Sequence, residues 1–75
     1  MTLKIILPTN IDAKTETHLI AALQDCHAEH VAGHEWRHSQ GVIYPPEFRE
    51  ELRNTLREDR KEDADLLEIT VFHPH

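Results

Sequence analysis

Apolar segments near the two ends of the chain have the pattern of β-strands. Leu3–Leu7 contains adjacent β-branched residues and stops at Pro8, which predicts a short and mostly buried strand. Leu66–Phe72 alternates in polarity, so it predicts another strand with one buried side. We expect Leu67, Ile69 and Val71 to face inward, and Glu68, Thr70 and Phe72 to face outward.

Helical spacing follows the first strand. Residues 9–12 include side chains that can cap a helix, and apolar positions then recur with the helical period. The predicted helix runs from about Ile11 to Ala32, and Gly33 would occupy the position after its end that favours glycine. Its inner face would carry Leu19, Ile20, Leu23, Cys26, His27, His30 and Val31.

The pattern changes to alternation at His34. His34, Trp36 and His38 alternate with charged or polar residues, and residues 39–41 end in a glycine that suits a three-residue loop. Residues 42–44 would return as the second arm. We therefore expect a hairpin made of residues 34–38 and 42–44.

A second helix is predicted after Pro45 and Pro46, because proline is favoured at the first helical position. By its spacing it would extend over roughly 17 residues. Its narrow inner stripe is expected to be Phe48, Leu52, Thr55, Leu56 and Asp59, and one flank carries Arg49, Arg53, Arg57 and Arg60. Two interpretations of this arginine flank remain open: a solvated face whose charges partly pair, or a contact surface for a partner rich in carboxylates or phosphates.

The predicted order of elements is β-α-β-β-α-β, in one α+β domain spanning residues 1–75. Two helices would pack on one face of a four-stranded antiparallel sheet, which is the ferredoxin-like arrangement. The other face of the sheet would stay open. We expect that face to carry Lys4, Ile6, Trp36, Phe72 and either Ile43 or Tyr44, with a residue near His34.

Acidic side chains outnumber basic ones by fourteen to eight, and the net charge is −6 with histidine neutral. This balance disfavours direct nucleic-acid binding, which needs a basic surface, and it favours a basic partner. No apolar stretch approaches the roughly 20 residues that span a membrane, and no export signal is visible. We therefore expect a cytoplasmic protein without membrane contact, and its one cysteine excludes an internal disulfide.

Residues 34–38 match the pattern H-E-x-x-H, and Gly41 extends the match to H-E-x-x-H-x-x-G. This stretch resembles the zinc-binding helix of metzincin proteases. The resemblance implies that His34 and His38 bind zinc and that Glu35 activates a bound water. It departs from the family at Tyr44, where a third metal ligand would stand. It also depends on a helix, since on a strand the two histidines would be about 13 Å apart.

A metal site without catalysis is a second hypothesis for the histidines. His27, His30, His34 and His38 could share a structural zinc, with Cys26, His73 and His75 as further ligands. The alternative is that they are hydrogen-bonded residues at the edge of the core, with no metal bound. A third possibility is pH-gated association, because clustered histidines change charge between about pH 5 and 8.

The main functional hypothesis is a small acidic module that binds another protein, and we expect it not to be an enzyme. Its more specific form is an inhibitor, of the kind found among small phage proteins, that occupies the nucleic-acid-binding site of its partner. The alternative partner is a second copy of the chain, as a homodimer. Aromatic and arginine side chains commonly anchor such interfaces. The expected anchors are Trp36, Tyr44, Phe72, Arg49, Arg53, Arg57 and Arg60.

Overall fold

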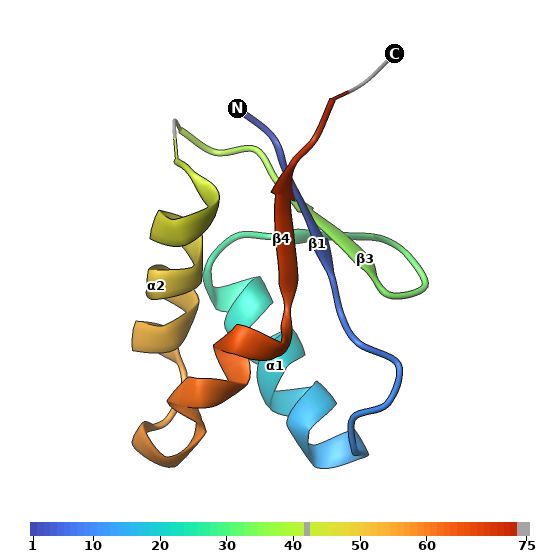
Figure 1. The fold of residues 1–75 in the computed structure, drawn as a ribbon, viewed down its shortest axis with the longest axis vertical. Helices are drawn as coiled ribbons and strands as arrows, with labels where there is room; N and C mark the ends of the chain where they lie inside the picture. Colours follow the sequence, from blue (N-terminus) through green and yellow to red (C-terminus); the bar gives the residue numbers. More distant parts are fainter. Residues whose placement is uncertain (42, 74–75) are drawn as a thin grey trace.

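The chain forms an α+β structure with one antiparallel sheet. The computed structural model describes residues 1–41 and 43–73, and over these residues it contains four strands, two α-helices and one 3₁₀ helix (Figure 1). The elements are β1 (Leu3–Ile6), α1 (Ala13–Asp25), β2 (Glu29–Ala32), β3 (Glu35–His38), α2 (Pro45–Thr55), the 3₁₀ helix η1 (Glu58–Leu66) and β4 (Glu68–Val71). The sheet has the order β2-β3-β1-β4, and every neighbouring pair is antiparallel. The predicted class and the antiparallel sheet are confirmed.

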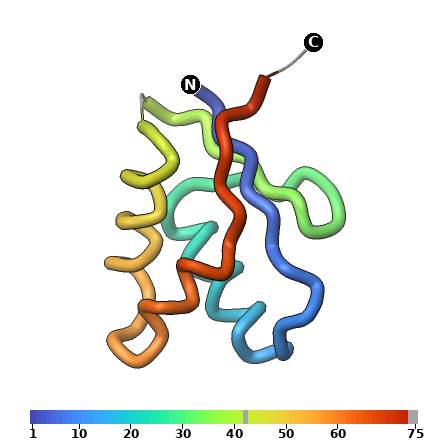
Figure 2. Tube along the Cα trace, viewed as in Figure 1, coloured from blue at the N-terminus to red at the C-terminus, as the bar shows by residue number. Residues whose placement is uncertain are grey.

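The register of the sheet decides which residues enter the core. Ile5 lies opposite Trp36 on β3 and Ile69 on β4, so the three side chains share one face. All three are buried in a cluster with residues of α1 and α2. The strands β1 and β4 run side by side although they come from opposite ends of the sequence (Figure 2). The largest fully buried side chains are Leu3, Ile5, Leu19, Leu23, Phe48 and Leu52.

The last strand has the predicted facing. Leu67 and Ile69 are buried, and Val71 packs against the core cluster. Glu68 and Thr70, between them, are exposed. The inward and outward positions expected from alternation are therefore confirmed for residues 67–71, whereas Phe72, which lies beyond the end of β4, is partly buried.

Helix α1 begins at a polar cap, as the sequence predicts. Asp12 is the N-cap residue, and its Oδ1 accepts a hydrogen bond from the backbone N–H of Thr15 at 2.8 Å. The Thr15 side chain and this backbone bond together hold the pKa of the Asp12 carboxyl below its ordinary value of 3.8, because both stabilise the ionised form.

The end of α1 differs from the prediction. The helix stops at Asp25, and His27 takes the left-handed conformation with φ 66°. The N–H of His27 bonds to the carbonyl of Gln24 at 3.0 Å, and the N–H of Ala28 bonds to that of Leu23 at 2.9 Å. These two bonds are the Schellman pair that closes a helix C-terminus. The prediction of a helix continuing to Ala32 is wrong.

The segment after α1 forms the first arm of a hairpin instead. Strand β2 pairs with β3, and Ala32 lies opposite Glu35 across a two-residue loop. Gly33 has φ 52° in that loop, in the left-handed region that glycine adopts without strain. Residues 35–38 form a strand as expected, but residues 43–44 do not form the predicted return arm, and residue 42 lies outside the described residues.

Strand β2 lies at the edge of the sheet, and all four of its residues are exposed. Its register with β3 shifts between His30 and Ala32. The shift leaves Val31 between the two paired positions, with 45% of its surface exposed. The edge is therefore short and irregular.

Helix α2 is shorter than predicted. It ends at Thr55, and Leu56 has extended backbone angles, φ −71° and ψ 154°. The 3₁₀ helix η1 then occupies residues that the sequence assigned partly to the same helix and partly to a charged turn. The predicted inner stripe is confirmed for Phe48, Leu52 and Leu56, which are buried.

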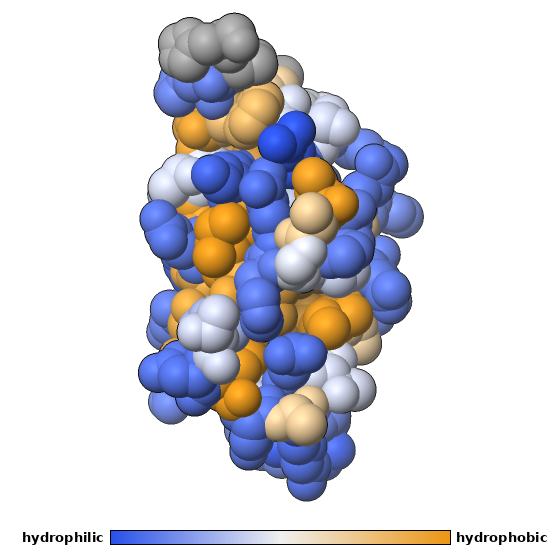
Figure 3. Space-filling model, turned by 90° about the vertical axis from the view of Figure 1, so that its right-hand side faces the viewer, coloured by the Kyte–Doolittle hydropathy of each residue, from blue (hydrophilic) through white to orange (hydrophobic). Residues whose placement is uncertain are grey.

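Trp36 does not lie on the open face of the sheet, so that expectation is wrong. Its pairing with Ile5 turns it toward the core, where only 6% of it is exposed. Glu35 and Arg37 therefore take the open side, and Arg37 lies opposite Lys4. The face in Figure 3 shows hydrophobic side chains in separate groups with polar side chains between them.

Within residues 1–41 and 43–73, no helix is both long enough and apolar enough to cross a bilayer.

Candidate functional site

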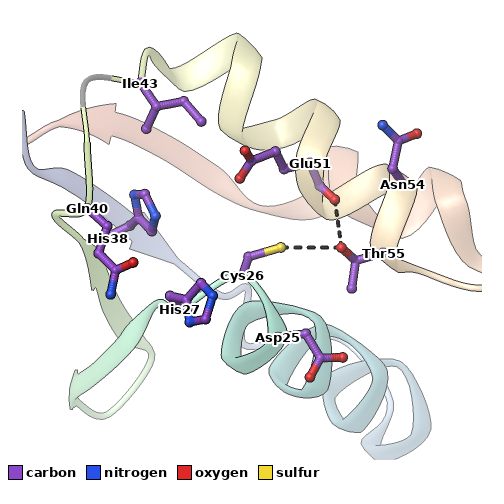
Figure 4. A pocket seen from close by; sticks show the side chains of 9 residues that line it. All are labelled: Asp25, Cys26, His27, His38, Gln40, Ile43, Glu51, Asn54 and Thr55. Atoms are coloured by element: carbon purple, nitrogen blue, oxygen red, sulfur yellow. Dashed lines mark hydrogen bonds between the residues drawn. The ribbon is translucent and has the colours of Figure 1, made fainter.

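A cavity of about 450 Å³ lies where α1, the end of β3 and α2 meet (Figure 4). Helix α1 contributes its last residue and the two that follow, β3 contributes its last residue, and α2 contributes residues of its second half, while Gln40 and Ile43 lie between β3 and α2. This convergence follows from the early stop of α1, which turns the chain away at His27. The cavity is lined by Asp25, Cys26, His27, His38, Gln40, Ile43, Glu51, Asn54 and Thr55.

His27 is presented to the cavity by an unusual backbone. It is the only non-glycine residue among the described ones with positive φ, a conformation that costs most side chains on the order of 1 kcal/mol or more. Histidine tolerates this region better than most residues. The strained position places an exposed imidazole at the mouth of the cavity, directly after the cysteine.

Cys26 is a buried thiol in a hydrogen-bond chain. Its Sγ lies 3.3 Å from the Oγ1 of Thr55, whose hydroxyl donates to the carbonyl of Glu51 at 2.9 Å. Because the hydroxyl proton is already engaged, the thiol is the donor to Thr55. Burial raises the pKa of the Cys26 thiol above its ordinary value of 9.0, and the nearby Glu51 carboxylate adds to the rise. Cys26 is therefore a protonated thiol at neutral pH, without the lowered pKa of a nucleophile.

His38 is the most constrained residue of the site. Only 5% of it is exposed, and its ring packs on Phe48 with 4.5 Å between centroids. Burial lowers the pKa of His38 below its ordinary value of 6.5, and Glu51 opposes that shift. Among the described residues, its Nδ1 is the one buried side-chain nitrogen or oxygen without a hydrogen-bond partner. Such a group costs about 1–3 kcal/mol unless something bonds to it.

The predicted metal ligands do not gather at one point. His27 and His38 both line the cavity, whereas the Nε2 of His30 lies 2.9 Å from the carbonyl oxygen of Gly33 and its ring lies against Trp36 at 5.2 Å. His34 is in the hairpin loop. Within the described part of the chain, no group of three or more His, Cys, Asp or Glu side chains is arranged to hold a metal ion. The zinc site stays a prediction, and His75 lies outside the described residues.

The resemblance to the metzincin helix requires residues 34–38 to be helical, and in this fold they are not. Glu35 and His38 belong to strand β3, and His34 precedes that strand. The two histidines are therefore not one helical turn apart, and the zinc-binding geometry of that helix is not formed. A catalytic zinc at this motif has no geometric support in the described residues.

The predicted aromatic anchors have different surroundings. Trp36 is buried and borders a second cavity, of about 280 Å³, with His30. Tyr44 precedes α2 and is 53% exposed. Phe72 is partly buried, and the guanidinium of Arg37 lies 4.0 Å from its ring centre. Their role in protein binding stays a prediction, and Tyr44 is the most accessible of the three.

Three of the four flanking arginines hold the fold together. Arg49 donates to the carbonyls of residues 64 and 67, at 2.5 and 2.9 Å. Arg53 lies 2.6 Å from Asp65, and Arg60 lies 3.1 Å from the hydroxyl of Thr15 on α1. Arg57 pairs with an aspartate at 3.4 Å but keeps 70% of its side chain exposed. The arginines thus mainly fasten η1 to its neighbours, and an additional partner contact stays a prediction.

Sequence reasoning did not bring Cys26, His38 and Glu51 into one site. It placed Cys26, His27 and His30 near the end of a predicted helix and His34 and His38 on a predicted hairpin. Glu51, on the predicted second helix, was not connected with them. The hairpin could have been found from Gly33-His34, a two-residue loop between four-residue segments.

Comparisons with protein-family models, with curated proteins and with solved structures found no match. A function for this chain therefore rests on its own residues and their geometry.

Proposed function

We propose that the protein is a small acidic module that binds a partner protein with a basic surface. The observation that carries the proposal is that most basic side chains form hydrogen bonds or ion pairs with groups of the same molecule. Arg49 bonds to backbone carbonyls, and five others form ion pairs: Arg37, Arg53, Arg57, Arg60 and Lys61. Over the described residues, only Lys4 and Lys14 lack such a partner.

The carboxylates have the opposite distribution. The sequence has fourteen, and those in ion pairs are Glu35, Glu50, Glu58, Asp59, Asp63 and Asp65. The eight outside these pairs, within the described chain, are Asp12, Glu16, Asp25, Glu29, Glu47, Glu51, Glu62 and Glu68. All but Glu16 are exposed. Most basic side chains are thus paired with carboxylates of the same molecule, and the remaining unpaired carboxylates make the surface negative. Such a surface attracts basic surfaces over distances of about 10 Å.

A more specific form of the proposal is that the carboxylates compete with nucleic acid for the partner. An exposed set of unpaired carboxylates can stand in for a row of phosphates, since both are recognised by arginine and lysine. In that case the partner is itself a nucleic-acid-binding protein, and the module inhibits it. A homodimer is a weaker proposal, because two surfaces of the same sign repel each other.

The test begins with partners captured from a lysate and identified by mass spectrometry. Their affinity for the full chain would then be measured from about 50 to about 300 mM salt, where screening weakens contacts between exposed charges. We expect a steep loss of affinity with salt, and a further loss in the variant with Glu29, Glu47, Glu62 and Glu68 changed to Gln. The matched variant Lys4→Gln with Lys14→Gln should bind as well or better. An affinity that changes neither with salt concentration nor with the Gln substitutions would contradict the proposal.

Competition separates the two forms of the proposal. If the module occupies a nucleic-acid-binding site, adding the partner's nucleic acid should release it in proportion to concentration. If it binds elsewhere, a ternary complex should form. Gel filtration with both ligands present distinguishes these outcomes.

We also propose that the chain adopts the ferredoxin-like arrangement, with α1 and α2 packed on the same face of the sheet. The order β2-β3-β1-β4 supports it, with α1 between β1 and β2 and α2 between β3 and β4. The 3₁₀ helix η1 would then be an addition in the connection to β4. An experimental structure would test the packing of the two helices directly.

A further inference from the structure

Strand β4 forms the edge of the sheet opposite to β2. Over the described residues it pairs with β1 alone, and no helix or strand is drawn across it in Figure 1. Unlike β2, it keeps a regular register with its neighbour along its whole length, from Glu68 to Val71. A regular edge strand presents a row of backbone groups with which another strand can pair.

The phase of the hydrogen bonds between β1 and β4 shows which of these groups face outward. The N–H of Phe72 bonds to the carbonyl of Thr2 at 2.9 Å, which continues the ladder beyond the end of β4. In an antiparallel pair, the backbone groups of successive residues point to opposite sides of the strand. The groups of the even-numbered residues therefore point toward β1, and those of Ile69 and Val71 point away from the sheet.

Arg49 marks where the accessible part of this edge begins. The carbonyl of Leu67, which has the outward phase, accepts a hydrogen bond from the Arg49 guanidinium at 2.9 Å. Among the described residues, no side chain of another element bonds to the outward backbone groups of Ile69 or Val71. These two residues are thus the ones that can pair with an added strand.

A second copy of the chain fits this edge in a defined register. If two β4 strands run antiparallel with their Thr70 residues opposite each other, Ile69 of each copy lies opposite Val71 of the other. Both of these pairs then exchange backbone hydrogen bonds, because their outward groups face one another. The two-fold axis passes through the Thr70 pair, so the same surface of each copy meets itself, as in most dimers.

The side chains also match in this register. On the side of the sheet that carries the helices, apolar Ile69 meets apolar Val71 of the other copy. On the open side, Thr70 meets Thr70, and both threonines are exposed in the single chain. Such cross-strand pairs of β-branched residues stabilise antiparallel sheets.

Charge favours this contact, in contrast to a contact between two acidic surfaces. Glu68 is exposed and belongs to none of the ion pairs of the described chain, and it would lie opposite Phe72 of the other copy. The Arg37 guanidinium lies 4.0 Å from the centre of the Phe72 ring, and Glu35 engages only part of its donors. Glu68 of one copy can therefore pair with Arg37 of the other.

We propose that two copies of the chain pair through β4 and join their sheets into one. Because β2 is irregular, the outer edges do not add further strands, and the assembly closes at the dimer. Few backbone groups take part, so this is a weak and reversible dimer. It does not depend on the acidic surface, and the binding of a basic partner would stand or fall separately.

The main test places a cysteine on the two-fold axis. Thr70→Cys puts two thiols at a cross-strand pair whose Cα atoms are about 4.5 Å apart, within the range of a disulfide. Glu68→Cys is the matched control on the same exposed side, because its two copies would be about 13 Å apart along the strands. Native Cys26 is buried and stays in both variants.

We expect mild oxidation to give disulfide-linked dimers of Thr70→Cys at least about tenfold faster than of Glu68→Cys, because only the first pair is within reach. Equal rates would mean random collision and would overturn the proposal. Faster linkage of Glu68→Cys would overturn the register.

Val71→Pro tests the backbone pairing without a cross-link. It removes an N–H that points away from β1, so the ladder inside the sheet is kept, and edge strands tolerate proline for this reason. Sedimentation from about 10 μM to about 1 mM should show a growing dimer fraction for the native chain and only monomer for the variant. Amide NMR signals of β1 and β4 would show that the variant is folded.

A native chain that stays monomeric over this range would overturn the proposal, and would leave the edge to a strand of another protein. Equal dimerisation of Val71→Pro would also overturn it.

The contact between Glu68 and Arg37 has its own readout. Glu68→Gln should weaken dimerisation by about threefold, the scale of one exposed ion pair. Glu62→Gln removes another exposed, unpaired carboxylate from η1, away from β4, and should not weaken it. Equal weakening by both variants would overturn the pairing of Glu68 with Arg37.

Discussion

At the scale of single residues, His38 shows how burial and charge act against each other. Its ring contributes packing against Phe48, but its Nδ1 is removed from water without a partner among the described groups. Burial favours the neutral ring, while the carboxylate of Glu51 favours the charged one. The first effect is larger, so the native state holds His38 without a proton at neutral pH.

This balance predicts a loss of stability in mild acid. The unfolded chain titrates His38 near its ordinary pKa of 6.5, and the folded pKa is lower. The unfolded state thus binds more protons below about pH 6.5, and the free energy of unfolding falls there by at most about 1.4 kcal/mol per pH unit. Urea denaturation at about pH 7.5 and 5.5 measures it. His38→Phe should reduce the slope, whereas the exposed control His73→Asn should keep it.

His27 is a second residue whose effect can be isolated. Its left-handed backbone is one that glycine adopts without strain, so His27→Gly should raise the free energy of unfolding by about 0.5–1 kcal/mol. The same change at Ala21, exposed within α1, should lower it by about 1 kcal/mol. Thermal and urea unfolding compare the two. A destabilised His27→Gly variant would show that the imidazole contributes more than the backbone strain removes.

At the scale of elements, η1 depends on side chains from α2 more than on its own sequence. It has one buried residue, Ala64, and no side-chain cap at its start. Runs of 3₁₀ helix this long are uncommon, because their hydrogen bonds have poorer geometry than those of an α-helix. Arg49 and Arg53 hold its end by bonds to the carbonyls of residues 64 and 67 and to Asp65.

Removing the Arg49 contact should therefore loosen η1 selectively. Arg49→Met keeps the aliphatic stem but leaves two carbonyls without their donor, and should cost about 2 kcal/mol. Hydrogen exchange should become faster at residues 58–66 than in the sheet. Arg57→Met is the control, and should stay within about 0.5 kcal/mol because that side chain is mostly exposed. Uniform acceleration across the chain would contradict a local role for Arg49.

The sequence predicted those elements whose patterns are local. β1, the cap of α1, the facing of β4 and the apolar stripe of α2 all follow from periodicity or from one capping residue. The end of α1 did not follow, because a histidine holds the left-handed position where glycine is usual. The end of α2 at Leu56 also has no glycine or proline to mark it. Trp36 was misplaced because its facing depends on pairing with Ile5, which is a tertiary contact.

At the scale of the whole molecule, the charge is divided between internal pairs and an unpaired surface. Two variants of equal net charge can separate the effect of the internal ion pairs on stability from the effect of the unpaired carboxylates. Changing Glu29, Glu47, Glu62 and Glu68 to Gln should relieve repulsion and raise stability at low salt. Neutralising Glu35, Glu50, Glu58 and Asp65 should lower it, because basic side chains then lose their partners. Urea unfolding at low and high salt measures both, and the difference should shrink as salt rises. Equal effects would mean that net charge alone decides stability.

The irregular edge at β2 also affects how copies of the protein meet. An exposed strand edge can template pairing with another chain, and this is a common route to aggregation. Here the edge strand has four residues, Glu29 brings a charge, and the register shift at Val31 bends the row of backbone groups. A flat incoming strand cannot match that row over its length. The short, irregular strand β2 therefore also disfavours pairing between the sheets of two molecules at its edge.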